Sequence, residues 1–231
     1  MDKRVASAEA AVARIKDGAT ILMGGFGAAG VPENLIRALV EQGTRDLTIV
    51  SNNAGIAGYG IDLLIKNKKV KKMIASFVGG NKTFEQLALK KEIDLELNPQ
   101  GTLAERIRCG GAGIPAFFTP TGYGTLAAEG KEVREFNGRP HILVPSLRGD
   151  VAFVKAWKGD RWGNLVFRKT ARNYNAVMAT AADYVIAEVE NLVELGEIEP
   201  DGVHTPSVYV DVIFQGEKYE KPIEIRTVRK R

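Results

Sequence analysis

The chain contains very few of the residues that form disulfides and metal sites. Cys109 is its single cysteine, and His141 and His204 are its two histidines. One cysteine cannot form an internal disulfide and is typical of a reducing compartment. The two histidines are far apart in the sequence and have no neighbouring ligands, so we expect no metal site. We interpret them as ordinary hairpin and loop residues, and Cys109 as a packed residue near a helix end.

The chain also lacks long apolar runs and a large excess of one charge. No uninterrupted apolar stretch approaches the ~20 residues of a membrane helix, and no apolar signal region follows residues 1–4. We therefore expect a cytoplasmic protein without a membrane or nucleic-acid partner. The net charge is only +4, and part of it lies in residues 217–231, which we interpret as a basic, solvated C-terminal tail.

The most informative stretch is glycine-rich and covers residues 17–32. Residues 19–23 are a short apolar run between turn signals, as in a buried strand. Pro32 suits the start of a helix over residues 33–42. A glycine loop that leads into a helix N-terminus offers free backbone N–H groups to an anion. Four glycines let the backbone turn sharply and lie close to a ligand: Gly24, Gly25, Gly27 and Gly30.

Two simpler interpretations of these glycines compete. Gly25, Gly27 and Gly30 satisfy the G-x-G-x-x-G pattern of dinucleotide-binding folds. That pattern requires an acidic residue at the end of the next strand, at residues 47–50, where the chain has Ser-Asn-Asn instead. A role in packing alone accounts for one or two glycines better than for four.

Strands and helices alternate through the first half of the chain. This alternation predicts an α/β fold with an open, doubly wound, mostly parallel sheet. Ligands bind at the carboxyl ends of the strands in such sheets, so we expect the loops after the first, second and fourth strands to share one rim. Patterns predict strands at residues 19–23, 47–50, 70–76 and 93–97, and helices at residues 5–15, 33–42, 61–67, 83–89 (capped by Asn81 or Thr83) and 102–108.

Beyond Gly110 the pattern predicts an inserted antiparallel sub-sheet. The dipeptide Asn137-Gly138 is a strong hairpin signal, and a second turn covers residues 159–164. The strands expected around these turns are residues 133–136 with 141–144, and residues 151–157 with 165–167. A helix at residues 174–182 and strands at residues 183–189 and 208–214 complete the expected elements.

Residues 17–32 resemble the first signature of the family I coenzyme A (CoA) transferases. That signature has Asp-Gly, apolar residues, Gly-Gly-Phe and then Gly-x-Pro, and every position is present here. The chain is most similar to the A (alpha) subunit of 3-oxoacid CoA-transferases. The resemblance extends to about residue 216 through blocks at residues 51–55, 99–106, 110–117, 121–125, 134–138 and 167–173.

The resemblance implies a CoA-transferase domain at residues 1–216 that uses CoA as a substrate, with no tightly bound cofactor. Gln100 matches a glutamine thought to stabilise an oxyanion in the family, whereas its sequence context alone indicates a turn residue. Arg168, Lys169 and Arg172 are candidates for CoA phosphates or an acidic partner, and a solvated cluster is an equal alternative. The residues implied to bind CoA are Gly24, Gly25, Phe26, Gly27, Ala28, Ala29, Gly30, Asn52 and Asn53, although an Asx turn explains the two asparagines equally well.

The catalytic glutamate of the family is missing. In the family a glutamate attacks the acyl-CoA, and a glutamyl–CoA thioester forms in a ping-pong reaction. Its Ser-Glu-Asn-Gly block does not occur here, and Glu33, Glu129 and Glu135 stand in other contexts. Many bacterial members divide the enzyme between two chains. The resemblance therefore implies an A (alpha) subunit that moves CoA from succinyl-CoA to acetoacetate or 3-oxoadipate, with the glutamate on the B subunit of an A2B2 assembly.

Two alternatives from other functional classes remain on a related α/β fold. One is a nucleotide-dependent oxidoreductase, which the missing carboxylate after the second strand disfavours. The other is an effector-binding sensor domain, which the lack of a flanking helix-turn-helix segment disfavours.

Overall fold

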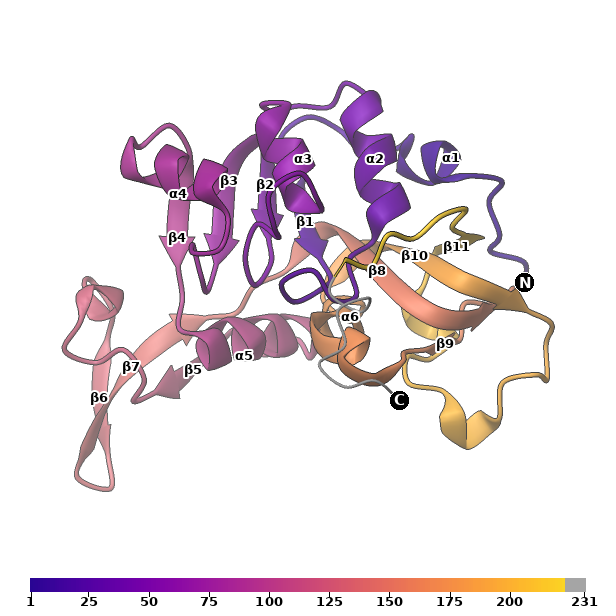
Figure 1. The fold of residues 1–231 in the computed structure, drawn as a ribbon. Coiled ribbons are helices and arrows are strands. Elements are labelled where there is room, and N and C mark those ends of the chain that lie inside the picture. The colour runs from indigo at the N-terminus through magenta and orange to yellow at the C-terminus, as the bar shows by residue number, and fades with distance from the viewer. Residues whose placement is uncertain (223–231) are drawn as a thin grey trace, which may run out of the picture.

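A mostly parallel sheet carries the architecture in the computed structural model, which describes residues 1–222 (Figure 1). A short strand, β9 (Leu165–Val166), lies outside the main strand order and pairs antiparallel with the long strand β8 (Gly149–Asp160). The remaining strands are all parallel, in the order β11 (Val212–Gln215), β10 (Ala182–Val193), β8 (Gly149–Asp160), β1 (Thr20–Met23), β2 (Leu47–Val50), β3 (Val70–Ala75) and β4 (Asp94–Leu97).

Helices cover both faces of this sheet. Successive side chains of a strand point to opposite faces, so Ile21 and Met23 of β1 join one core and Leu22 joins the other. Four helices cover the first face: α1 (Ala8–Val12), α2 (Glu33–Glu41), α3 (Ile61–Lys66) and α4 (Lys82–Leu89). The second face is covered by α5 (Gln100–Gly111) and α6 (Asn173–Met178). The predicted doubly wound α/β fold is therefore confirmed.

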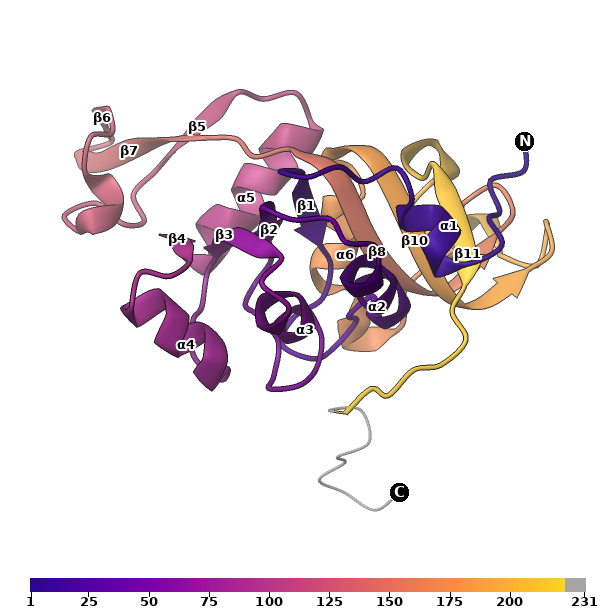
Figure 2. The ribbon, with the colours of Figure 1, turned by 90° about the horizontal axis from the view of Figure 1, so that it is seen from above.

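A separate three-stranded antiparallel sheet projects from the main body. It contains β5 (Ala116–Thr119), β7 (Arg139–Pro145) and β6 (Val133–Phe136), in that order. Asn137 and Gly138 both have positive φ, at 52° and 72°, as the hairpin signal predicts. We call residues 116–145 the arm, and in two perpendicular views it extends away from the main sheet (Figures 1 and 2).

The second predicted pair of the inserted sub-sheet was assigned to the wrong sheet. Residues 151–157 belong to β8, which lies between β10 and β1 in the main sheet. The physical reason is burial: Ala152, Phe153 and Val154 are 0% exposed, so both faces of this strand are covered. A strand covered on both faces has a continuous apolar run instead of alternation. The predicted antiparallel pairing is present only where the end of β8 pairs with β9.

Several predicted boundaries were also wrong. The first helix spans Ala8–Val12 instead of residues 5–15, and α6 ends at Met178. The last predicted strand, at residues 208–214, begins only at Val212 because Pro206 starts a short 3-10 helix at Ser207–Tyr209. The N-cap of α4 is Asn81, one of the two predicted caps, and its side chain accepts a hydrogen bond from Phe84 N–H at 3.0 Å. The other 3-10 helices are Leu126–Ala128, Lys169–Arg172 and Pro200–Gly202.

Helix α2, which follows the glycine loop, is capped by a residue from a distant strand. Its N-cap is Pro32, which has no side chain that can accept a hydrogen bond. Glu188 of β10 takes this role: it accepts bonds from Leu35 N–H at 2.9 Å and from the Asn34 amide at 2.7 Å. Glu188 is 0% exposed, and burial raises its pKa to about 7 despite these bonds.

Residues 217–222 lie across the start of the same helix. The backbone N–H of Glu220 donates to Glu33 at 2.8 Å, and Arg37 donates to the Lys218 carbonyl at 3.0 Å. Lys221 forms an ion pair with Glu190 at 2.6 Å. The basic residues that we assigned to the rest of the tail, from Arg226 onward, lie outside the described residues. Among residues 1–222, no helix has the length and apolar character needed to cross a membrane.

The raised pKa of Glu188 predicts a pH dependence of stability. Between its ordinary pKa of 4.5 and its folded value of about 7, the folded chain binds a proton that the unfolded chain releases. The free energy of unfolding therefore falls as the pH rises through this window, by up to about 3 kcal/mol. Glu188→Gln keeps an acceptor for Leu35 and does not titrate, so it should gain stability relative to the unchanged chain between pH 5 and pH 8. Urea unfolding at both pH values measures this difference, and an equal difference at both would contradict it.

Candidate active site

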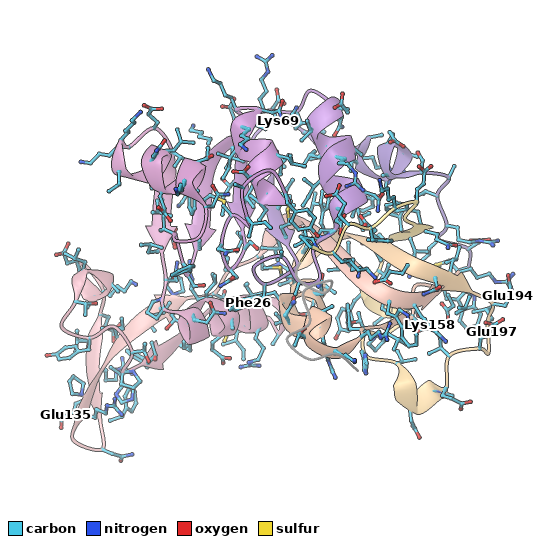
Figure 3. All side chains as sticks on the ribbon, in the orientation of Figure 1. Phe26, Lys69, Glu135, Lys158, Glu194 and Glu197 are labelled. Atoms are coloured by element: carbon cyan, nitrogen blue, oxygen red, sulfur yellow. The ribbon has the colours of Figure 1, made fainter. Side chains whose placement is uncertain are left out.

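The loops that follow β1, β2 and β3 meet the start of α5 at the carboxyl ends of the strands. Figure 3 shows Phe26, from the loop after β1, at the opposite end of the sheet from Lys69, which precedes β3. Phe26 and Phe77 remain 49% and 55% exposed at this rim. The rim predicted from the strand order is therefore present, with the fourth-strand loop contributing through Gln100.

The glycine loop, residues 24–30, folds back on itself. Gly24 N–H donates to the Phe153 carbonyl at 2.9 Å, and Phe26 and Ala29 exchange two backbone hydrogen bonds, each of 3.0 Å. Gly25, Gly27 and Gly30 have φ values of +115°, +61° and +71°, which residues other than glycine rarely adopt. The sequence pattern thus identified a loop that needs its glycines.

Two asparagines that the sequence pattern did not indicate hold this loop in place. Asn175 is 0% exposed, donates to the carbonyls of Gly30 and Ala171 at 2.9 Å each, and accepts from Lys155 N–H at 2.8 Å. Asn173 donates to the Ala29 carbonyl at 3.0 Å. Asn173 ends the resemblance block at residues 167–173, but no pattern assigns either residue this role, because the loop carbonyls that they bind lie 144 and 145 residues away.

Close packing against these asparagines explains two of the four glycines. A Cβ atom on Gly24 would lie 1.9 Å from Asn175 Oδ1, and one on Gly30 would lie 2.8 Å from the Ala171 carbonyl oxygen. A Cβ on Gly27 would meet nothing within 4 Å. Packing and backbone freedom therefore both operate here, at different glycines.

The loop also retains backbone donors. Gly27 N–H donates to Asn52 Oδ1 at 3.3 Å, whereas the N–H groups of Gly25, Ala28 and Gly30 have no acceptor within residues 1–222. Buried backbone N–H groups nearly always have a partner. A small cavity of about 10 Å³ lies between the glycine loop and the loop that follows β2, and is lined in part by Gly25, Asn53 and Gly55. These groups suit an anionic or carbonyl oxygen.

Gln100 lies at the centre of a hydrogen-bond network on this rim. Its Oε1 accepts from Asn52 Nδ2 at 3.1 Å and from the Ser76 hydroxyl. Its Nε2 donates to the Tyr174 hydroxyl at 3.1 Å, and its second Nε2 hydrogen has no acceptor within residues 1–222. Burial raises the pKa of Tyr174 to about 12, so this hydroxyl stays protonated at neutral pH. The structure thus brings Gln100, Asn52 and the glycine loop together.

Asn53 has a different role from Asn52. Its Oδ1 accepts from Gly55 N–H at 3.0 Å, which is the Asx turn that the sequence left open as an alternative. The Asx turn is therefore confirmed at Asn53, and CoA binding by Asn52 stays a prediction.

A partly buried ion pair positions the start of α5 and hence Gln100. Arg106 binds Glu96 at 2.5 Å, the Asn98 amide oxygen at 2.8 Å and the Pro145 carbonyl at 2.9 Å. Burial alone would raise the pKa of Glu96, but hydrogen bonds from Lys72 and Arg106 outweigh it and lower the pKa to about 2. Glu96 is therefore a structural carboxylate.

The remaining candidates from the sequence lie away from this network. Glu33 is buried and accepts from the Tyr59 hydroxyl at 2.8 Å, while Glu129 and Glu135 are exposed on the arm. Cys109 is 1% exposed within α5, as predicted. His204 accepts from Phe167 N–H at 2.9 Å, which fits a structural loop residue. Arg168, Lys169 and Arg172 are exposed, and Arg168 stacks over the Trp157 ring at 5.5 Å.

The contact between Gly24 and Asn175 gives a test of the loop architecture. Gly24→Ala places a methyl group in the position of the Asn175 amide and should reduce the free energy of unfolding by about 2 kcal/mol or more. Gly101→Ala is the matched control, because Gly101 is exposed on the same rim and its Cβ would meet nothing within 4 Å. Chemical denaturation of both variants measures the effect, and equal losses would show that the contact does not matter.

Comparisons with known proteins agree on one family. The family profile described as Coenzyme A transferase matches residues 5–216. The A subunit of the probable succinyl-CoA:3-ketoacid coenzyme A transferase of Bacillus subtilis (strain 168) is 55% identical over 229 residues, which cover 99% of this chain and 96% of that protein. The mitochondrial succinyl-CoA:3-ketoacid coenzyme A transferase 2 of Homo sapiens is 49% identical, over 94% of this chain but only 45% of that protein.

The fold matches as well. The crystal structure of the acyl-CoA transferase YdiF from Escherichia coli O157:H7, in a thioester complex with CoA, superposes with a TM-score of 0.82 and 25% identity over 92% of this chain and 47% of that chain. The profile match and the 55% identity to the bacterial protein over nearly its full length lead to one conclusion. This chain belongs to the coenzyme A transferase family.

Proposed function

We propose that the chain is the A subunit of a 3-oxoacid CoA-transferase that takes CoA from succinyl-CoA. The observation that carries this proposal is the 55% identity to a bacterial A subunit over almost the full length of both chains. The acceptor is a 3-oxoacid, with acetoacetate and 3-oxoadipate as the two candidates. CoA is a substrate here and no tightly held cofactor is required.

The nucleophilic glutamate comes from a partner chain, the B subunit. The rim around Gln100 presents amides, hydroxyls and backbone N–H groups, whereas Glu33 is bound to Tyr59 and Glu96 to Arg106. The human mitochondrial relative is more than twice as long as the part that this chain covers, which supports a second half with its own contribution. We extend the proposal to an A2B2 assembly in the cytoplasm, with residues 1–216 as the transferase domain.

The chemistry of this chain is to stabilise charge and to position the thioester. A partner carboxylate oxygen attacks the thioester carbonyl, the C–S bond breaks, and CoA leaves as a thiolate while an anhydride forms. The thiolate then attacks the glutamyl carbonyl and succinate leaves, which gives the glutamyl–CoA thioester. Each addition places negative charge on a carbonyl oxygen. The unpaired Nε2 hydrogen of Gln100 and the free N–H groups of the glycine loop are the donors proposed to meet it.

The divided site predicts that neither chain works alone. Transfer from succinyl-CoA is measured with acetoacetate and with 3-oxoadipate, for this chain by itself and after coexpression with its B subunit. We expect activity only in the coexpressed complex, and the preferred acceptor identifies the 3-oxoacid. Full activity of the isolated chain would disprove the division of the site. Stable binding of the B subunit without transfer to either acid would disprove the proposed substrates.

The network around Gln100 predicts a graded loss of turnover in that complex. Gln100→Ala removes a donor to the developing oxyanion, so kcat should fall by about 10²–10³-fold with little change in KM. Tyr174→Phe removes one partner of the Gln100 amide but leaves Asn52 and Ser76 in place, so we expect a fall of about tenfold. Tyr123→Phe is the control, because Tyr123 is exposed on the arm. If Gln100→Ala raised only KM, the residue would serve binding instead of catalysis.

A further inference from the structure

Strand β6 leaves one long side of the arm open. In the order β5-β7-β6 it is the edge strand, and no strand within residues 1–222 pairs with its other side. All four of its residues are exposed, with Val133 at 50% and Phe136 at 40%. The arm extends away from the helices in both ribbon views (Figures 1 and 2), and Glu135 lies on its outer side (Figure 3). An exposed edge strand is a template for another chain.

The backbone groups available at this edge can be assigned. Leu143 N–H donates to the Glu132 carbonyl at 2.8 Å, so the even-numbered residues of this segment face β7. Because hydrogen-bonding groups alternate along an antiparallel strand, Val133 and Glu135 direct their N–H and C=O groups outward. Lys131 N–H already donates to the Ala128 carbonyl at 3.1 Å. A strand that paired with the open side of β6 would therefore form its last hydrogen bond at the Lys131 carbonyl.

The charged side chains on this edge are complementary to those of a second, antiparallel copy of the same edge. Residues 131–135 read Lys-Glu-Val-Arg-Glu. If a second copy runs antiparallel with Val133 opposite Val133, Lys131 faces Glu135 and Glu132 faces Arg134, each twice. Opposite charges directly across a ladder stabilise it and like charges oppose it. Edge charges usually prevent pairing, but this arrangement permits pairing with a copy of itself.

Symmetry selects the same register. When two copies of one strand pair antiparallel about a two-fold axis, one residue lies opposite its own copy on the axis. Each face of the combined sheet is then formed by the same face of both copies. The neighbouring symmetric registers, centred on Glu132 or Arg134, would place like charges against each other. The register centred on Val133 avoids this. It also continues the face on which Arg134 stacks over Phe118 at 4.9 Å and Phe136 packs against Phe118 at 5.2 Å.

We propose that β6 binds β6 of a second copy of this chain, so that two arms form one continuous antiparallel sheet. Charge pairs and backbone hydrogen bonds hold this contact, with Val133 on the two-fold axis. It provides the contact between the two copies of this chain in the proposed A2B2 assembly, and in that respect alone it rests on the proposed function. The contact concerns association and is measured without any transfer reaction.

Charge exchange tests the register. Neither Lys131 nor Glu135 forms an ion pair within residues 1–222, so changing either should leave the folded chain intact. Lys131→Glu or Glu135→Lys places two like-charge pairs in the dimer and should weaken self-association at least about tenfold. The double variant restores both pairs and should return within about threefold of the original dissociation constant. Sedimentation equilibrium of the chain alone, and the mass of its complex with the B subunit, measure this.

A cysteine cross-link gives a positive signal. Val133→Cys places two thiols opposite each other and should give a covalent dimer under mild oxidation. Glu135→Cys is the control, since its two copies would be about 13 Å apart along the ladder, beyond disulfide reach. Cys109 is 1% exposed and does not compete.

The proposal is overturned if the unchanged chain stays monomeric both alone and in the complex. Single charge reversals that leave association unchanged, or a double variant that fails to restore it, would overturn it as well. A complex that contains two copies of this chain but lacks CoA transfer would instead contradict the proposed function and leave the arm contact standing.

Discussion

The buried amide of Asn175 is the contact on which the site depends. With one side chain it holds the last carbonyl of the glycine loop, the turn before α6 and the backbone of β8. Its position also explains why Gly24 has no side chain, since a Cβ there would occupy the same space. The loop is therefore not a flexible segment awaiting a ligand. It is fixed by a satisfied polar group, which is how buried amides contribute a unique conformation.

Carboxylates have structural roles around this rim, while neutral groups line it. Glu188 caps α2 from within the core, and Glu96 neutralises Arg106 beneath α5. Their pKa values are displaced in opposite directions because no cation forms an ion pair with Glu188 within residues 1–222, whereas Lys72 and Arg106 both pair with Glu96. Beside the exposed rings of Phe26 and Phe77, the rim carries the amides of Gln100 and Asn52 and the Ser76 hydroxyl. These polar groups can donate hydrogen bonds but include no carboxylate, which matches the missing family block.

The sequence predicts the features that depend on neighbouring residues, such as turns and helix caps. It does not predict side chains whose hydrogen-bond partners are distant in the chain. Glycines before a helix, Asn81 as a cap and Asn137-Gly138 as a hairpin each act within a few residues, and the structure has all three. Asn175 and Glu188 act on partners 145 and 153 residues away, so no pattern announces them. Strand β8 was assigned to the wrong sheet because its two parallel partners, β1 and β10, do not adjoin it in the chain. The rim itself was predictable, since parallel strand order places loop ends together.

The contact between residues 217–222 and Glu33 has a practical consequence for protein engineering. The backbone of Glu220 and Lys221 is held at the first turn of the helix that leaves the glycine loop. A single-chain version that joins this chain to the proposed B subunit should therefore keep residues 217–222 intact. A junction placed before residue 222 would remove these backbone hydrogen bonds from the start of α2.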